Sequence, residues 1–183
     1  MDLAQIVAFA KQGIEPIESA AGMPAYRCSA YLKDGLYLPC VLLASAASQV
    51  ALASRRFDET KAQERSGKAG HGMRYSDIVR TFAAGGNRLN DYDIERIEKS
   101  PFAIPLERLR EVDGETSMSW TQFGAVMTDG KEFYFGTTFL TEFFQMPVGY
   151  SGEDIARIIP HRKGDGALYR ERPFFTCFTQ GLD

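Results

Sequence analysis

Two stretches of the chain alternate apolar and polar residues around an Asp-Gly pair, which is the pattern of a β-hairpin. The first covers residues 25–43 and turns at Asp34-Gly35, and the second covers residues 119–139 and turns at Asp129-Gly130. Glycine accepts the positive φ that a tight hairpin turn requires. Pro39 has no N–H to donate, so we expect its strand to lie at a sheet edge or to be bulged there.

Two further strands are expected, one at residues 49–57 and one at residues 173–180. The two hairpins share a small residue, apolar residues and the Asp-Gly turn. This likeness raises the hypothesis of an internal duplication. A duplication normally shows more matched positions than this, and any two tight-turn hairpins look alike, so both interpretations stay open.

Apolar residues spaced three and four apart predict four or five short helices. Residues Asp2, Ser76 and Ser151 have the short polar side chains that cap helix starts. In the third candidate helix, Ile94 and Ile97 form the inward face. The expected helices cover residues 2–12, 75–86, 90–101, 105–112 and 150–160.

These elements predict an α+β fold, in which an antiparallel sheet of two β-hairpins plus extra strands packs with four or five short helices. The reason is that strands and helices do not alternate regularly along the chain. A length of 183 residues suits one domain over residues 1–183. Residues 58–74 are polar and without periodicity, and we expect them to form a flexible loop.

Composition places the chain among cytoplasmic, bacterial-type globular proteins. Hydrophobic residues make up 44%, and the net charge is −3, which argues against wholesale nucleic-acid binding. Three cysteines without a C-x-x-C pair make a disulfide framework unexpected. Neither a signal peptide nor an apolar stretch long enough to span a membrane is visible.

The segment RSGKAGHGMR, residues 65–74, has the composition of an anion-binding loop. Glycines before a helix start expose backbone N–H groups, and Lys68, His71 and Arg74 add charge and a proton-transfer group. Its glycine spacing matches neither nucleotide-binding fingerprint. A mobile surface loop is the main expectation, and contact with a phosphate-bearing ligand is the alternative.

Positive charge concentrates in two segments. Residues 55–80 hold seven basic and four acidic residues, and residues 157–172 hold five and two, so each carries +3. The second segment adds His161 and Arg162 to the candidate ligand-binding residues. Such segregation can attract an acidic partner, although solvated loops are the simpler interpretation.

Metal and nucleophile chemistry have little support. Asp34 followed by Glu59-x-Lys61 resembles a nuclease metal pattern, but that pattern needs a buried strand and this segment is polar. Neither histidine has a partner at metal-ligand spacing, so we expect no metal and no cofactor. The cysteines lie among apolar residues and are expected to be buried: Cys28, Cys40 and Cys177.

Aromatic residues concentrate between residues 120 and 150. Core packing explains most of them. The adjacent Phe143 and Phe144 cannot both face inward on a regular element, so one of them is expected to line a pocket or an interface. With Tyr150 they form the candidate partner-binding residues.

The sequence thus favours a non-catalytic binding, accessory or inhibitor-like module over an enzyme. The expected partner is a protein, nucleic acid is less favoured, and no membrane is involved. The alternative function is an enzyme or binder that acts on a nucleotide or nucleic acid through the 65–74 loop.

Overall fold

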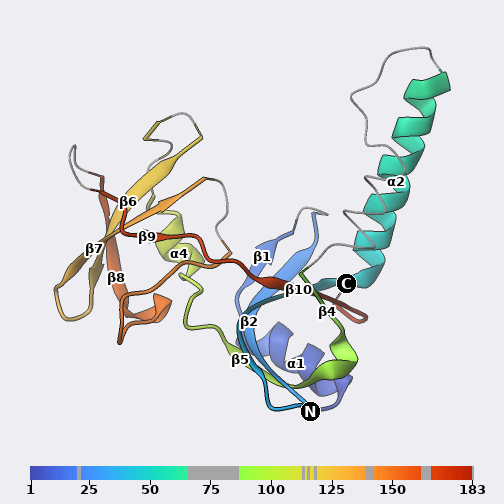
Figure 1. Ribbon diagram of the computed structural model, residues 1–183, viewed down its shortest axis with the longest axis horizontal. Helices are drawn as coiled ribbons and strands as arrows, with labels where there is room; N and C mark the ends of the chain where they lie inside the picture. The colour runs from blue at the N-terminus through green and yellow to red at the C-terminus, as the bar shows by residue number, and fades with distance from the viewer. Residues whose placement is uncertain are drawn as a thin grey trace.

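Two β-sheets organise the structure (Figure 1). The computed structural model describes residues 1–19, 22–65, 87–112, 114, 116–117, 119–138, 142–161 and 166–182. In these residues the large sheet has six strands: β1 (Pro16–Glu18), β2 (Pro24–Leu32), β3 (Tyr37–Ser45), β4 (Arg88–Leu89), β5 (Ile94–Lys99) and β10 (Phe175–Thr179). The small sheet, within the same described ranges, has four: β6 (Thr121–Met127), β7 (Glu132–Thr137), β8 (Ile155–Pro160) and β9 (Tyr169–Arg170).

The small sheet is inserted in sequence between two strands of the large sheet. The large sheet has the order β1-β2-β3-β10-β4, with β5 also paired to β2, and the small sheet has the order β8-β6-β7-β9. All four strands of the small sheet therefore follow β5 and precede β10. The chain leaves the large sheet, builds the small one and returns to add β10 beside β3 (Figure 1).

Both predicted hairpins and the C-terminal strand are confirmed, but the expectation of an antiparallel sheet is wrong. β10 pairs in parallel with β3 and β4, and β9 pairs in parallel with β7. No tight turn joins these neighbours, so nothing local forces them to run antiparallel. The irregularity expected at Pro39 is confirmed, because the register between β2 and β3 shifts opposite it, between Cys28 and Ala30.

The described residues contain three α-helices, fewer than expected: α1 (Leu3–Gly13), α2 (Ala46–Arg65) and α4 (Leu106–Leu109). Asp2 caps α1 as predicted, since its carboxylate accepts a 2.8 Å hydrogen bond from the Gln5 N–H. The helix expected at 75–86 lies outside the described residues. Of the helices that are described, none is both long and apolar enough to cross a bilayer.

Helix α2 overturns two expectations. Residues 49–57 are helical rather than a third antiparallel strand, and residues 58–65 are helical rather than part of a loop. Residues 66–74 of that loop lie outside the described residues. Figure 1 shows α2 extending away from both sheets. Arg55 and Arg56 lie 4.0 and 3.2 Å from the Glu59 carboxylate, pairs that form only at helical spacing.

The helices expected at 90–101 and 150–160 are each a 3-10 turn followed by a strand. The turns are η2 (Asp91–Asp93), before β5, and η3 (Gly152–Asp154), before β8. Each strand carries a bulge after its first residue, which lets two residues face one on the neighbouring strand. Because of the bulge, Ile94 and Ile97 both face the core of the large sheet, and Ile155 and Ile158 both face the core of the small sheet. Apolar residues three apart, a spacing typical of helices, therefore occur here in strands.

The same pairing scheme occurs in both sheets, which supports the internal duplication. β2 pairs with β3 through an Asp-Gly turn and with β5 on its other side, and β6 pairs with β7 and β8 in the same way. The equivalent pairs are Tyr31↔Arg96 and Val126↔Arg157, each beside the bulge. We call the unit of α1, β2, β3 and β5 the first repeat, and that of α4, β6, β7 and β8 the second.

Further details recur in the two repeats. The N–H of Lys33 donates to the Asp93 carbonyl at 2.9 Å, and that of Thr128 donates to the Asp154 carbonyl at 2.8 Å. Each repeat also receives a parallel strand from the C-terminal part of the chain, β10 on β3 and β9 on β7. An Asp-Ile-x-Arg-Ile segment occurs at residues 93–97 and again at 154–158, so the likeness of the repeats extends beyond the hairpins.

Three apolar clusters hold the described fold together. The first lies between α1 and the large sheet, and the second fills the inner face of the small sheet beside α4. The third covers the other face of the large sheet where the two repeats meet, with Phe143 among Ala25, Cys40, Leu42 and Ala44. Burial of these side chains is the main favourable contribution to folding.

Candidate functional site

The structure describes only one of the residues that the sequence indicated for ligand binding. His161 directly follows β8 and is half-buried. The others lie outside the described residues: Lys68, His71, Arg74 and Arg162. A phosphate site in residues 65–74 therefore stays a prediction.

His161 lines a cavity of about 220 Å³ at the end of β8, which we call the β8 cavity. Its floor is apolar, because Phe123 and Ile159 lie there with only 2% and 7% of their surface exposed. Around this floor stand a carboxylate, a hydroxyl, an amide and an imidazole. The lining residues are Glu111, Thr116, Gln122, Phe123, Ile158, Ile159, Pro160 and His161.

Glu111 is the fixed anionic group of the β8 cavity. One carboxylate oxygen accepts from the Ile158 N–H at 2.9 Å, and the other from the Arg108 guanidinium at 2.6 Å. The Ile158 N–H first, and then Arg108, hold the pKa of Glu111 below its ordinary value. The carboxylate also covers part of the outer edge of β8, where an unpaired N–H would otherwise invite another strand.

Phe143 and Phe144 are both buried, with 1% and 0% exposure, and they enter different clusters. The ring of Phe143 lies 5.5 Å from that of Phe174 against the large sheet, whereas Phe144 lies 5.8 Å from Phe123 in the small sheet. Neither ring is available to a partner, which corrects the expectation that one of them lines a binding surface. The pair instead joins two cores.

Tyr150 joins the turn of the second hairpin to the segment before η3. Its hydroxyl donates to the Asp129 carboxylate at 2.6 Å and accepts from the Lys131 ammonium at 2.8 Å. The Tyr150 hydroxyl first, and then the Lys131 backbone N–H, lower the pKa of Asp129 to about 2. These bonds explain Tyr150 structurally, and its role toward a partner stays a prediction.

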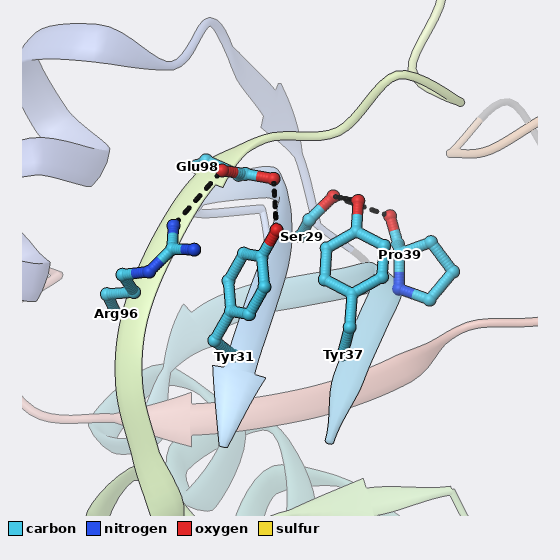
Figure 2. A network of polar contacts seen from close by, with 6 residues as sticks. All are labelled: Ser29, Tyr31, Tyr37, Pro39, Arg96 and Glu98. Carbon is cyan, nitrogen blue, oxygen red and sulfur yellow. Dashed lines mark hydrogen bonds and ion pairs between the residues drawn. The ribbon is translucent and has the colours of Figure 1, made fainter. Parts of the chain in front are cut away.

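Figure 2 shows a row of side chains that the sequence analysis did not single out, which we call the arginine–tyrosine row: Arg96, Tyr31 and Tyr37. The three residues sit side by side on β5, β2 and β3, on the face of the large sheet opposite α1. The Arg96 guanidinium lies 3.4 Å from the Tyr31 ring centre, and the two tyrosine ring centres are 4.7 Å apart. Stacking of this kind is favourable for arginine over an aromatic ring.

Polar contacts fix both ends of the row (Figure 2). At one end the Glu98 carboxylate accepts from Arg96 at 3.2 Å and from Tyr31 at 3.4 Å. At the other, Tyr37 donates to the Ser29 hydroxyl at 3.1 Å, which in turn donates to the bulged Pro39 carbonyl. The side chains are therefore held in place while the row stays open to solvent.

A sequence signal for the row exists. Tyr31 and Tyr37 flank the Asp34-Gly35 turn, so the hairpin brings them close. Its loop has three residues, 33–35, which makes the two tyrosines direct cross-strand partners. The residues beside them in β2 and β3, Ala30, Leu32 and Leu38, are buried and apolar, which places both rings on the opposite face. The contribution of Arg96 could not be read from sequence, because β5 was interpreted as a helix.

A second polar centre lies where the two repeats meet. Arg27 has only 3% of its side chain exposed, donates to the Ile104 carbonyl at 2.7 Å and lies 3.7 Å from the Glu15 carboxylate. Burial lowers its pKa, and the carboxylate of Glu15 first, then those of Glu142 and Glu153, oppose this effect. Its surroundings form a cleft of about 60 Å³, the junction cleft, lined by Ile14, Glu15, Arg27, Lys99, Ser100, Ala103, Pro105 and Glu153.

The remaining candidates do not assemble a site. Asp34 accepts from the Leu36 N–H within its turn, and Glu59 and Lys61 lie on α2 rather than on a buried strand, so the nuclease pattern fails. Across the described ranges, no three His, Cys, Asp or Glu side chains gather as a metal site would require. All three cysteines are buried, and burial raises the pKa of Cys40 to about 11 and that of Cys177 to about 12.

The fold and these sites define an α+β protein built from two repeated β-sheet units. The chain matches no protein-family model, and no curated protein or solved structure matches it.

Proposed function

We propose that the chain acts by binding a protein partner, as a non-catalytic accessory or inhibitor-like module. The observation that carries this proposal is the arginine–tyrosine row on the open face of the large sheet (Figure 2). Arginine and tyrosine are the residue types most enriched where interfaces gain their affinity, because each combines apolar area with directional hydrogen bonding.

Exposure and rigidity both favour this surface for binding. The Arg96 side chain is 45% exposed and Tyr37 is 37% exposed, while the neighbouring Leu36, at 53%, extends the apolar area. Side chains that are already fixed lose little conformational entropy when a partner covers them. The hydrogen bonds from Tyr31 to Glu98 and from Tyr37 to Ser29 provide that fixation.

Two single substitutions test the proposal, Tyr37→Ala and Arg96→Ala. Each should weaken the complex at least about tenfold, the loss expected for a residue near the centre of an interface. A matched control is Tyr92→Ala, because Tyr92 is 66% exposed but lies on η2, outside the row. Cross-linking in a lysate of the source cells would identify the partner, and calorimetry with the purified partner would give the affinities.

Retained folding is checked by near-ultraviolet circular dichroism of each variant. The proposal fails if the partner binds the wild type and both row variants equally. It also fails if the row retains single-stranded oligonucleotides and no protein, since stacked rings and arginine can bind exposed bases as well. In that case loss of the oligonucleotide on Arg96→Ala would assign the row to nucleic acid.

A further inference from the structure

The junction cleft and the β8 cavity occupy equivalent places in the two repeats. In the first repeat Cys28 pairs with Lys99 at the end of β5, and in the second Phe123 pairs with Pro160 at the end of β8. These pairs are equivalent, because they stand the same number of residues beyond the bulge in each strand. Lys99 lines the junction cleft, and both Phe123 and Pro160 line the β8 cavity.

The polar groups around the two sites are equivalent as well. Arg27 directly precedes the paired residue of β2, and Gln122 directly precedes that of β6, so each presents a side-chain donor at the same place. Glu15 lies two residues beyond the end of α1, and Glu111 lies two residues beyond the end of α4. Each site therefore has a side-chain donor and a carboxylate at equivalent positions.

In the first repeat this site is filled by a segment of the chain itself. The segment is Ala-Ile-Pro-Leu, residues 103–106. The Ile104 carbonyl accepts from Arg27 at 2.7 Å, and the Leu106 N–H donates to Glu15 at 2.8 Å. Pro105, between them, has the extended angles φ −53° and ψ 140°. Only about 60 Å³ of the cleft remains open.

In the second repeat the equivalent site is larger and its donors are not engaged in the same way. The β8 cavity has a volume of about 220 Å³. Within the part of the chain that the structure describes, neither the Gln122 amide nor the His161 ring forms a side-chain hydrogen bond. An apolar floor with unengaged amide and imidazole groups fits a ligand that has both apolar side chains and backbone polar groups.

We propose that the β8 cavity binds an extended, apolar, proline-containing peptide segment of a partner protein, in the manner of residues 103–106 in the first repeat. A ligand carbonyl accepts from the Gln122 amide, and the ligand N–H two residues later donates to the Glu111 carboxylate. In an extended chain these two groups point to the same side. Proline fits between them because it has no N–H that would need a partner there.

Two differences between the repeats make the second site suitable for reversible binding. Gln122 is a neutral donor, and its hydrogen bond to a carbonyl is weaker than that of the charged Arg27. Glu111 already accepts from Ile158 and Arg108, but each carboxylate oxygen has a second acceptor position. The ligand therefore adds to existing contacts and displaces none of them.

The test uses the heptapeptide acetyl-PFAIPLE-amide, a copy of residues 101–107, titrated into the full chain. Isothermal titration calorimetry measures the affinity, because the Trp120 indole lies against Gly136 and Arg170 and does not line the cavity. A peptide of this size is expected to bind with a Kd on the order of 1 mM or below. Gln122→Leu should weaken binding about tenfold, because it leaves the ligand carbonyl without a donor.

The opposite substitution sharpens the test. Gln122→Arg supplies the donor found in the first repeat and should tighten binding several-fold. A peptide N-methylated at its leucine lacks the N–H for Glu111 and should bind at least about tenfold more weakly. Gln12→Leu, an exposed glutamine on α1, is the matched control and should change nothing.

The proposal is overturned if the wild type and Gln122→Arg both fail to show saturable binding at millimolar peptide. It is equally overturned if binding occurs but ignores the Gln122 substitutions and the N-methyl group. The inference does not rest on the arginine–tyrosine row, which lies on the other sheet. Tyr37→Ala should therefore leave peptide affinity unchanged, so that either proposal can fail while the other stands.

Discussion

Replacing Gly152 with alanine should destabilise the fold strongly, because the new methyl group would meet backbone. A Cβ built at this position lies 2.1 Å from the Ala103 carbonyl oxygen and 3.0 Å from the Ile104 Cα. Backbone atoms cannot rotate away as the end of a side chain can. The Gly152 N–H also donates to the Pro101 carbonyl at 2.8 Å, so η3 cannot withdraw without losing that bond.

The expected magnitude follows from three contributions. Overpacking costs about 1–3 kcal/mol, and a weakened buried hydrogen bond costs about 1 kcal/mol. Alanine restricts the unfolded chain and so offsets about 0.5–1 kcal/mol of this loss. The free energy of unfolding should therefore fall by about 1–3.5 kcal/mol.

Equilibrium urea denaturation measures this difference, with a lower midpoint and an unchanged slope for Gly152→Ala. Gly166→Ala is the matched control, because a Cβ at that glycine meets nothing within 4 Å. The control should lose no stability, and the restricted unfolded chain should raise its free energy of unfolding by at most about 1 kcal/mol. A Gly152→Ala protein that unfolds at the wild-type urea concentration would refute the close approach of η3 to residues 101–104.

Three further predictions concern protonation and accessibility. The lowered pKa of Asp129 means that its contribution to stability is present above the ordinary aspartate pKa and is lost as pH falls toward about 2. Tyr150→Phe removes the main cause of this lowering, so the thermal midpoint of the variant should fall less steeply with decreasing pH than that of the wild type. Parallel curves of thermal midpoint against pH would contradict this prediction. Glu111→Ala removes the acceptor of the Ile158 N–H, so that amide should exchange with deuterium faster by NMR, and unchanged exchange would show that another group covers the strand edge. Three thiols are buried, and burial raises their pKa values: Cys28, Cys40 and Cys177. They should react with a disulfide reagent at about pH 8 only after denaturation. Prompt reaction of the native protein would argue against their burial.

Features coded by short-range chemistry could be predicted from the sequence. The Asp-Gly turns fixed both hairpins, and Gly35 and Gly130 adopt the expected positive φ of 86° to 89°. Asp2 capped α1, and Ser151 caps a helical turn as expected, although that turn is only η3. In each case one or two residues determine the local conformation without reference to the rest of the chain.

Features that depend on a partner strand could not be predicted. The spacing of Ile94 and Ile97, or of Ile155 and Ile158, is helical in sequence, and only the bulge in the neighbouring pairing makes it a strand. The parallel direction of β10 likewise follows from where the chain returns after the second repeat. Residues 49–57 illustrate the reverse error, since a strand was expected there and α2 forms.

In the candidate sites, too, features coded by neighbouring residues were predictable, whereas features that depend on strand pairing were not. The adjacent aromatic residues Phe143 and Phe144 predicted an exposed ring, because the sequence could not show that two separate cores receive them. Arg96 joins Tyr31 only because β5 pairs with β2. The equivalence of the junction cleft and the β8 cavity depends on the whole pairing scheme, so the hairpin likeness alone could not reveal it.

The nested order of the repeats has a consequence for biosynthesis. The second repeat is contiguous in sequence, and a ribosome completes it before it makes β10. Until then the edge of β3 opposite β2 is unpaired along Val41–Ser45, and β4 lacks the strand that links it to the sheet. The half of the protein that emerges first is thus finished last, and its waiting strand edge is where a nascent chain would be most open to mispairing or to a chaperone.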